Sequence, residues 1–499
     1  MTQAPSRGAL GMFGAVNDPS VVPEWMNTSI QTGLEPGHST IPDSGRSLDL
    51  VFIIDATGSM GSYINSATRN IESICDNIVQ SEFLSTKGAL RVGLIAYRDH
   101  PPQDHVYIVK NFGFTTSVLE MKENLNSLFA AGGGDGPEAT TAALKAATDL
   151  DWRSSAAKMA ILITDAPPHG IGEYGDGFPN GSPDGEDPLV LARKMSAMGI
   201  PLFVVACEPA LSGYQHAVDF YQGIVNVTGG MLVPLTTASL LSQVVIAAAG
   251  EVMDMERLHR EVGDSVLELM RNLSLTMGNE ASNDPASATE RLVDQVSAEL
   301  HEKLLLRNES TKQLIIESIY RESEESAHNI RVWSQAPDVF SARPHIRKVI
   351  GSRLSQKFIE MRRQAAQHGG HVPLRFGSLS PKSTRSGAPS SSSSTRQIVS
   401  QFHAFEARPG MSLHGSSGAT TDYARFGSDG YRTSSADDMD DDGDDAVMAD
   451  SHVDMGTQGL SEHDILFEGD DGQRLAFRHD AISLSQARRL AMQTLSRAS

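Results

Sequence analysis

The stretch LDLVFIIDATGSM, residues 48–60, is an apolar run that ends in an aspartate followed by small and hydroxyl-bearing residues. The run before Asp55 is continuous rather than alternating, which is typical of a strand buried on both faces of a parallel sheet. Asp55, Thr57 and Ser59 are spaced two residues apart. Carboxylate and hydroxyl oxygens at the end of a buried strand are suitable ligands for a hard cation. This stretch therefore predicts a metal site at one edge of a sheet.

Short β-branched runs alternate with helical patterns from residue 47 to residue 250, which indicates an α/β domain with helices on both faces of a parallel sheet. We expect strands at residues 48–55, 91–97, 105–112, 158–164, 201–207 and 231–235. We expect helices near residues 62–80, 117–128, 138–149, 187–198, 212–226 and 238–259.

The second and third strands are joined by RDHPPQD, residues 98–104, which is too short for a parallel crossover. The third strand should therefore be antiparallel and lie at an edge. The prediction is a doubly wound, mostly parallel six-stranded sheet of the Rossmann type with one antiparallel edge strand. In such sheets ligands bind beyond the carboxyl ends of the strands, near the point where the strand order reverses.

The remaining chain divides by composition. Residues 251–368 show helical apolar periodicity, for example in LVDQVSAELHEKLLLRN at 292–308 and KQLIIESIYRE at 312–322. This part could be a helical extension of the first domain or a small bundle of its own. Residues 1–46 are expected to be a flexible segment.

Residues 369–463 are rich in serine and glycine and contain an acidic block, so we expect a disordered linker. Residues 464–499 predict a hairpin and a short helix, because Ser483 and Gln486 form a capping pattern. This tail could dock on the chain, or it could fold only on a partner.

Charge and cysteine content exclude several classes of function. The net charge is −21 over 499 residues, and part of it lies in the block at 437–450. This balance argues against nucleic acid and anionic membranes as main partners. We find no apolar run of the roughly 18 residues that a membrane span needs. Two cysteines and no uninterrupted apolar stretch near residue 1 predict a reduced, cytoplasmic protein.

Two further segments should converge on the edge that carries Asp55. The glycine-rich loop AAGGGDGPEAT, residues 130–140, contributes Asp135, and Asp165 follows the expected strand at 158–164. With Thr57 and Ser59 these carboxylates match Mg²⁺, which takes about six oxygens at ~2.1 Å and keeps several waters. Zn²⁺ would call for cysteine and histidine instead. We expect Mg²⁺, with Mn²⁺ and Ca²⁺ as alternatives.

The loop after the second strand overhangs the same edge. Asp99 and His100 in this loop, and His169 in APPHG, are candidates for the rim of the site. For each histidine, a surface or hydrogen-bonded role is the plainer interpretation than a ligand role.

DATGSM at 55–60 and TDA at 164–166 together resemble the D-x-S/T-x-S element and the second acidic position of the von Willebrand factor A domain. The resemblance covers about residues 47–250. In that family these positions form a metal ion-dependent adhesion site, which implies Asp55, Thr57 and Ser59 as ligands and Asp165 as a direct or water-mediated one.

This sequence departs from the family at Asp135, where most adhesive members have threonine. The GGGD variant followed by PE resembles A domains that accompany alpha-type protein kinases. A third carboxylate should raise metal affinity but lower the positive charge offered to an incoming ligand. A structural metal is therefore an alternative to capture of a partner's carboxylate.

Three functions follow from these features. The first is a metal-dependent protein-binding module without enzymatic activity. The second is a scaffold in which the acidic segment and the tail helix are regulatory or partner-binding elements. We expect a protein partner to bind through the metal face or the C-terminal tail. The third is an alpha-kinase-related enzyme. Kinases of that type hold zinc with cysteine and histidine, and Cys75 and Cys207 both lie within the A domain. We also find no G-x-x-x-x-G-K-[ST] phosphate loop. An aspartate-nucleophile phosphatase would need a second acid where Thr57 stands.

Overall fold

The computed structural model describes residues 46–84, 86–277, 285–367, 465–469 and 473–498. Almost all of the expected N-terminal flexible segment, and the expected disordered linker at 369–463, lie outside these residues.

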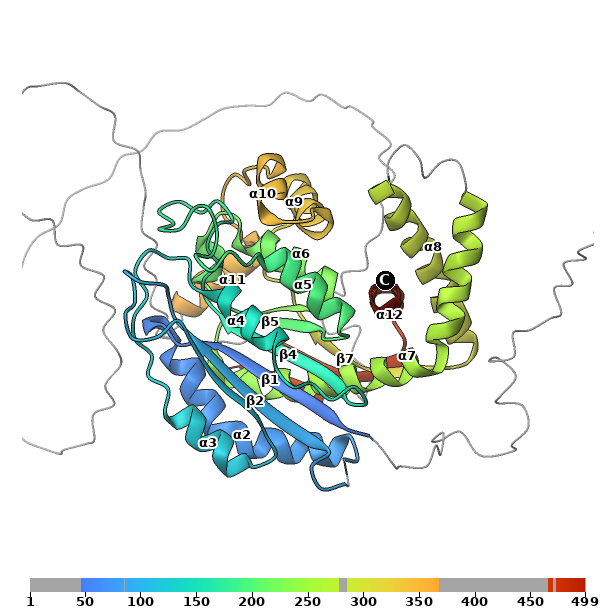
Figure 1. The fold of residues 1–499 in the computed structure, drawn as a ribbon, viewed down its shortest axis with the longest axis horizontal. Helices are drawn as coiled ribbons and strands as arrows, with labels where there is room; N and C mark the ends of the chain where they lie inside the picture. Colours follow the sequence, from blue (N-terminus) through green and yellow to red (C-terminus); the bar gives the residue numbers. More distant parts are fainter. Residues whose placement is uncertain (1–45, 85, 278–284, 368–464, 470–472, 499) are drawn as a thin grey trace, which may run out of the picture. The chain divides into compact units, whose positions relative to one another are not determined.

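The main sheet has six strands in the order β3-β2-β1-β4-β5-β6. Figure 1 labels four of these side by side, β2, β1, β4 and β5. β1 pairs in parallel with β2 and β4, and β3 is antiparallel to β2 at the edge, so the predicted doubly wound sheet is confirmed. The strands are β1 (Leu48–Asp55), β2 (Leu90–Tyr97), β3 (Val109–Thr115), β4 (Ala157–Thr164), β5 (Leu202–Cys207) and β6 (Leu232–Leu235).

β3 begins four residues later than predicted. The side chain of Asp104 accepts a hydrogen bond from the backbone N–H of Val106 at 2.7 Å, which forms a turn at these residues. β3 therefore begins only after this turn, at Val109.

Helices cover both faces of this sheet, because its central strands are buried on both sides (Figure 1). All eight residues of β1 are buried, including Asp49 and Asp55. One face packs against α2 (Gly61–Ser81), α3 (Val118–Asn126) and α7 (Leu241–Met277). The other face packs against α4 (Thr140–Thr148), α5 (Pro188–Ala197) and α6 (Ala217–Thr228). α6 begins later than predicted, and α7 continues well beyond residue 259.

A second sheet corrects the prediction that KQLIIESIYRE is helical. Ser310–Ile316 forms β7, which pairs antiparallel with β9 (Arg474–Ala481), and β9 pairs with β8 (Ile465–Glu468). The apolar pattern of this short run does not distinguish a helix from a strand. The strand that pairs with β7 lies more than 150 residues away, so the neighbouring sequence gives no sign of the pairing. β8 and β9 form the hairpin predicted for the tail.

The tail docks on the rest of the chain. α12 (Leu484–Ala498) packs against α7 and α8 (Pro285–Leu306) and shares one apolar core with them. Ser483 caps α12 by accepting a hydrogen bond from the N–H of Gln486, as the capping pattern predicts. The docked alternative therefore holds for residues 473–498.

Part of the helical extension packs on α6, a helix that covers the main sheet. α9 (Glu324–Gln335) lies against α6, and the fully buried Trp333 meets Phe220 edge to face. Asp219 of α6 binds Ser326 and Asn329 through its two carboxylate oxygens. Val339 and Ala342 of α10 (Val339–Ala342) belong to the same core as this face of the main sheet. Phe358 of α11 (Gln356–Gln367) packs in a small separate cluster with Ile319 and Leu354.

Within the described part of the chain, one helical stretch, Ala238–Ser274, is long and apolar enough to cross a membrane. Two thirds of its apolar window is buried inside the molecule. A buried core helix passes the same test, so this stretch is weak evidence for a membrane span.

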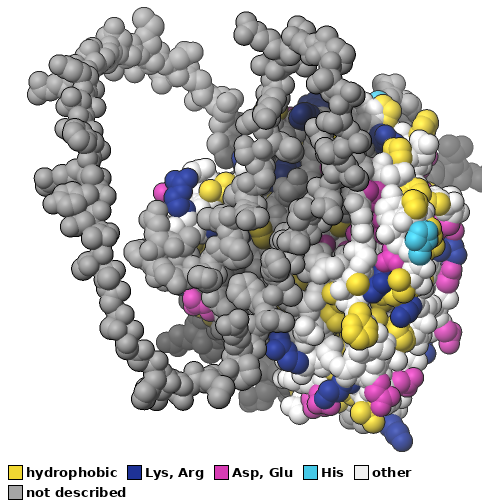
Figure 2. Space-filling model, turned by 90° about the vertical axis from the view of Figure 1, so that its left-hand side faces the viewer, with side chains coloured by type: hydrophobic (Ala, Val, Ile, Leu, Met, Phe, Trp, Pro, Cys, Tyr) yellow, Lys and Arg dark blue, Asp and Glu magenta, His cyan; other side chains and the backbone are white. Residues whose placement is uncertain are grey.

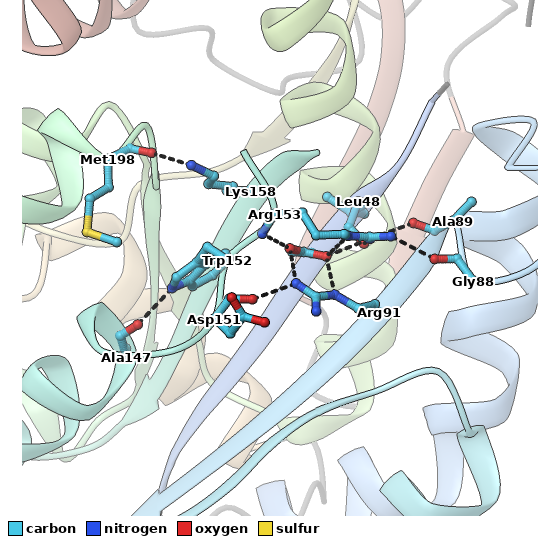
Figure 3. A network of polar contacts seen from close by, with 11 residues as sticks. Leu48, Gly88, Ala89, Arg91, Ala147, Asp151, Trp152, Arg153, Lys158 and Met198 are labelled. Atoms are coloured by element: carbon cyan, nitrogen blue, oxygen red, sulfur yellow. Dashed lines mark hydrogen bonds and ion pairs between the residues drawn. The ribbon is translucent and has the colours of Figure 1, made fainter. Parts of the chain in front are cut away.

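Asp49 is the second residue of β1 and lies at the opposite end of that strand from Asp55. Figure 3 shows Arg91 and Arg153, the two arginines that bind it. Its carboxylate accepts from Arg91 at 2.9 and 2.7 Å, and from the backbone and side chain of Arg153 at 2.8 Å each. Burial alone would raise the pKa of Asp49, but the two guanidinium groups hold it below its ordinary value. This network is structural and lies at the end of β1 opposite the candidate site.

Candidate metal centre

The parallel register of three strands brings the acidic residues to one edge. Asp55 is the last residue of β1, Asp99 follows β2 by two residues, and Asp165 follows β4 directly. β1 lies between β2 and β4 in parallel with both, so the three carboxyl ends meet at the same edge.

Asp55, Thr57, Ser59 and Asp165 form one group, which we call the first-strand group. The backbone N–H and the hydroxyl of Thr57 donate to Oδ1 of Asp55 at 2.9 and 2.6 Å. The hydroxyl of Thr164 donates to Oδ2 of Asp55 at 3.2 Å. The nearby side chain of Ser59 acts to lower the pKa of Asp165, against the effect of burial. The structure thus brings four of the five predicted ligands together.

The two carboxylates of the first-strand group carry unfavourable charge. Burial and the neighbouring Asp165 raise the pKa of Asp55 to about 7, and burial raises the pKa of Asp165. Asp55 is fully buried, Asp165 is half-buried and Ser59 is exposed. The group therefore opens to solvent on the side of Ser59, and a cation there would relieve the repulsion between the carboxylates.

Asp135, the fifth predicted ligand, makes its contacts in a neighbouring group. One ligand atom each from Asp99, Asp135 and His169 lie within 4.8 Å of one another. The other contacts of Asp135 are with the backbone N–H of Gly177 and, at 3.4 Å, with the amide of Gln103. Burial raises the pKa of Asp135.

The three residues predicted at the rim are instead buried: Asp99 is 0%, His100 3% and His169 1% exposed. His169 is held between two carboxylates, with Nε2 at 2.7 Å from Asp99 and Nδ1 at 2.8 Å from Asp176. Burial alone would lower the pKa of His169, but these carboxylates raise it to about 9. Burial lowers the pKa of His100.

The ring of Phe178 packs edge to face against both histidine rings. The ring centroids are 4.8 Å apart for His169 and 5.5 Å apart for His100. Phe178 and Asp176 come from the loop between β4 and α5. The sequence prediction missed both, because nothing in the sequence of the β4–α5 loop distinguishes them from surface residues.

Glu138 is a buried carboxyl group that the sequence prediction also missed. It lies three residues after Asp135 in the same loop, is 5% exposed, and its Oε2 has no hydrogen-bond partner. Burial and the surrounding acids, first Asp55 and then Asp99, raise its pKa to about 11. Its closeness to Asp135 in GGGDGPEAT is the signal that could have revealed it.

Gly133 lets the loop lie against Glu138. It has a φ of +82°, and a Cβ atom there would lie 2.6 Å from Oε1 of Glu138 and 3.5 Å from Cβ of Thr57. Only glycine fits this place without displacing the carboxyl group.

These residues fit a divalent cation. Asp55, Asp165 and Glu138 supply carboxylate oxygens, and Thr57 and Ser59 supply hydroxyl oxygens, which is the donor set of a hard ion. The raised pKa values and the unpaired Oε2 of Glu138 indicate that positive charge would stabilise the cluster. Oxygen donors alone do not choose between Mg²⁺, Mn²⁺ and Ca²⁺.

Residues 49–226 match the family model of the von Willebrand factor type A domain, which confirms the resemblance seen in the sequence. A segment of the chain is 32% identical over 142 residues to the alpha-protein kinase vwkA of Dictyostelium discoideum, and covers 28% of this chain and 22% of that protein. The chain is also 25% identical over 273 residues to the putative ariadne-like RING finger protein R811 of Acanthamoeba polyphaga mimivirus. This match covers 52% of this chain and 26% of that protein. The chain thus spans about a quarter of the length of these relatives.

Among solved structures, the pilus adhesin SpaC of Lactobacillus rhamnosus GG in its open conformation is similar at 14% identity and a TM-score of 0.32, over 42% of this chain and 30% of that one. Proximal thread matrix protein 1 of the mussel byssus is similar at 14% identity and a TM-score of 0.28, over 41% of this chain and 48% of that one. Similarities at this level carry no argument about function.

Proposed function

For a chain whose residues 49–226 form a von Willebrand factor type A domain, we propose a non-enzymatic module that binds a divalent cation and, through it, a protein partner. Asp55, Thr57, Ser59 and Asp165 hold the ion in this proposal, and Mg²⁺ is the ion that we expect. The observation that carries it is a group of three carboxyl groups with raised pKa values, those of Asp55, Glu138 and Asp165, near the carboxyl ends of β1 and β4.

The partner is proposed to bind at the metal rather than at the tail. Ser59 is exposed, so one side of the first-strand group is open to an incoming oxygen ligand. By contrast, the apolar residues Leu490 and Ala491 of α12 are buried against α7 and α8. The tail helix therefore has less apolar surface to offer than an undocked helix would.

The distribution of charged side chains does not favour a nucleic-acid partner. On the face drawn in Figure 2, the acidic and basic side chains of the described residues are interspersed, and the basic ones do not gather into a stripe. Phosphate binding needs Lys and Arg in excess on one surface.

The kinase alternative is supported by no described residue. Cys75 lies on α2 and Cys207 on β5, and both are free and buried in the core. Among the described residues, neither cysteine belongs to a group of three or more potential metal ligands.

We also propose a cytoplasmic location, which rests on the two unpaired, buried cysteines. Fractionation of cells that express the tagged chain checks it, and recovery in the secreted or membrane fraction would contradict it.

Thermal unfolding of the full chain tests the metal site. After treatment with a chelator, addition of Mg²⁺ or Mn²⁺ should raise the unfolding midpoint in proportion to the logarithm of the ion concentration, because the ion binds only the folded state. Asp55→Asn should remove the response to Mg²⁺. Asp76→Asn, an exposed carboxylate on α2, is the matched control and should keep it.

Partner capture tests the rest of the proposal. A partner retained by the wild type should be lost both with a chelator and with Asp55→Asn, and kept with Asp76→Asn. Capture that ignores the chelator while the midpoint responds to Mg²⁺ would leave the metal with a structural role only.

A further inference from the structure

A second group of potential ligands lies beside the first-strand group. Asp99 comes from the end of β2, Asp135 from the glycine-rich loop, and His169 from the segment after β4. Their ligand atoms lie within 4.8 Å of one another. Two ligands on opposite sides of one ion, each at about 2.0–2.4 Å, are separated by no more than about this distance. One cation could therefore contact all three.

Asp176 fixes the orientation of the His169 ring. Its Oδ1 lies 2.8 Å from Nδ1 of His169 and accepts from the N–H of Phe178 at 2.8 Å, while its Oδ2 accepts from the N–H of Gly170 at 2.7 Å. With Nδ1 held by Asp176, Nε2 is directed toward Asp99. Histidines that bind metals are commonly held in this way by a carboxylate on their other ring nitrogen.

Two carboxylate oxygens of this group lack any partner. Oδ2 of Asp99 and Oδ1 of Asp135 are buried and make no hydrogen bond, and Asp99 is 0% exposed. An unpaired buried carboxylate oxygen is costly, so positive charge is expected next to it.

A protonated His169 is the plain alternative. An imidazolium would donate one hydrogen bond to Oδ1 of Asp99 and one to Oδ1 of Asp176, so each of these two oxygens would have a partner. It does not pair Oδ2 of Asp99 or Oδ1 of Asp135, because both ring nitrogens are already used. A metal ion at Nε2 accounts for all three residues.

We propose that Asp99, Asp135 and His169 bind a second divalent cation, separate from the one assigned to Asp55, Thr57, Ser59 and Asp165. One imidazole nitrogen with two carboxylates suits a borderline transition-metal ion such as Zn²⁺, whereas the all-oxygen first-strand group suits a hard ion. The second ion ties the glycine-rich loop and the loop between β4 and α5 to the end of β2.

Titration of the full metal-free chain with Co²⁺ tests this proposal, with the visible spectrum and equilibrium dialysis as readouts. We expect two equivalents in the wild type. Asp55→Asn should bind one equivalent and keep the stronger visible bands of the nitrogen-containing site. His169→Gln should lose those bands, with Co²⁺ affinity at that site at least about tenfold weaker, and keep one equivalent. The control His105→Gln replaces an exposed histidine in the connection between β2 and β3, and it should behave as the wild type.

Asp135→Asn guards against misfolding of the His169 variant, because Asp135 is only half-buried. It should lose the second equivalent and keep the first. A single equivalent in the wild type that Asp55→Asn abolishes, or unchanged bands in His169→Gln and Asp135→Asn, would overturn the second site while leaving the proposed function intact. Two equivalents in the Asp55 variant would instead contradict the first site alone.

Discussion

The backbone N–H of Glu138 donates a hydrogen bond to the carbonyl oxygen of Pro167 at 2.9 Å. The next residue, Ala139, donates in turn to the carbonyl oxygen of Arg98 at 2.9 Å. These two bonds join the end of the glycine-rich loop to the segments that follow β4 and β2. They place the buried Glu138 carboxyl group among acids of both metal-ligand groups.

Glu138→Gln should therefore have opposite effects without and with metal. Without metal, it removes a buried carboxyl group with an unpaired oxygen, and we expect the free energy of unfolding to rise by about 1–3 kcal/mol. With saturating Mg²⁺, the gain in midpoint should be smaller than in the wild type, because an anionic oxygen is lost. Urea unfolding in chelator and in Mg²⁺ measures both. Glu123→Gln, exposed on α3, should change neither. A variant less stable than the wild type in chelator would contradict this account.

Asp49 anchors the opposite end of β1, and Asp49→Asn should destabilise the protein without changing its metal response. The substitution leaves Arg91 and Arg153 without their shared anion, and breaking one partner of a buried ion pair typically costs about 3–5 kcal/mol. Urea unfolding measures the loss. Asp151→Asn is the control, because that side chain is exposed and only its backbone carbonyl binds Arg91. A loss below about 1 kcal/mol would show that the network contributes little net stability.

The sheet and the first-strand group were predictable because local sequence determines them. The strand ending at Asp55 is recognisable from its own apolar residues, and parallel pairing then brings Asp165 to the same edge without further information. The hydroxyls of Thr57 and Ser59 follow from the spacing within one turn.

The rest depended on contacts that spacing does not encode. Gly132, Gly133 and Gly136 all have positive φ, and these values decide that Asp135 and Glu138 take part in different contacts. His169 contacts Asp176 and Phe178, which lie seven and nine residues further along the chain in the loop between β4 and α5. β7 was mistaken for a helix because β9 follows it only after a long stretch of chain.

Glu208 should make stability depend on pH. It is 6% exposed after β5 and accepts from the hydroxyl of Tyr320 at 2.7 Å and the N–H of Ser212 at 3.0 Å. Burial raises its pKa from 4.5 to about 7. The folded state thus binds this proton more tightly than the unfolded state, so the contribution is full below about pH 4.5 and is lost as pH rises through about 7.

Glu208→Gln should remove that dependence. Between about pH 5 and about pH 8, the wild type should lose about 2–3 kcal/mol more of its free energy of unfolding than the variant does. Urea unfolding of both proteins across this range measures the difference. Parallel pH profiles would mean that Glu208 titrates normally in the folded state.

The docked tail offers the sharpest test of the fold, because one helix carries both a buried and an exposed leucine. Leu490 of α12 is 0% exposed in the core shared with α7 and α8, whereas Leu484 on the same helix is 52% exposed. Leu490→Ala should lower the free energy of unfolding by about 2–4 kcal/mol, because it removes buried methyl groups and leaves a cavity. Leu484→Ala should change it by less than about 0.5 kcal/mol. Near-equal effects would mean that α12 does not hold this position in solution. The metal response should survive in both variants, since α12 packs away from the carboxyl ends of β1, β2 and β4.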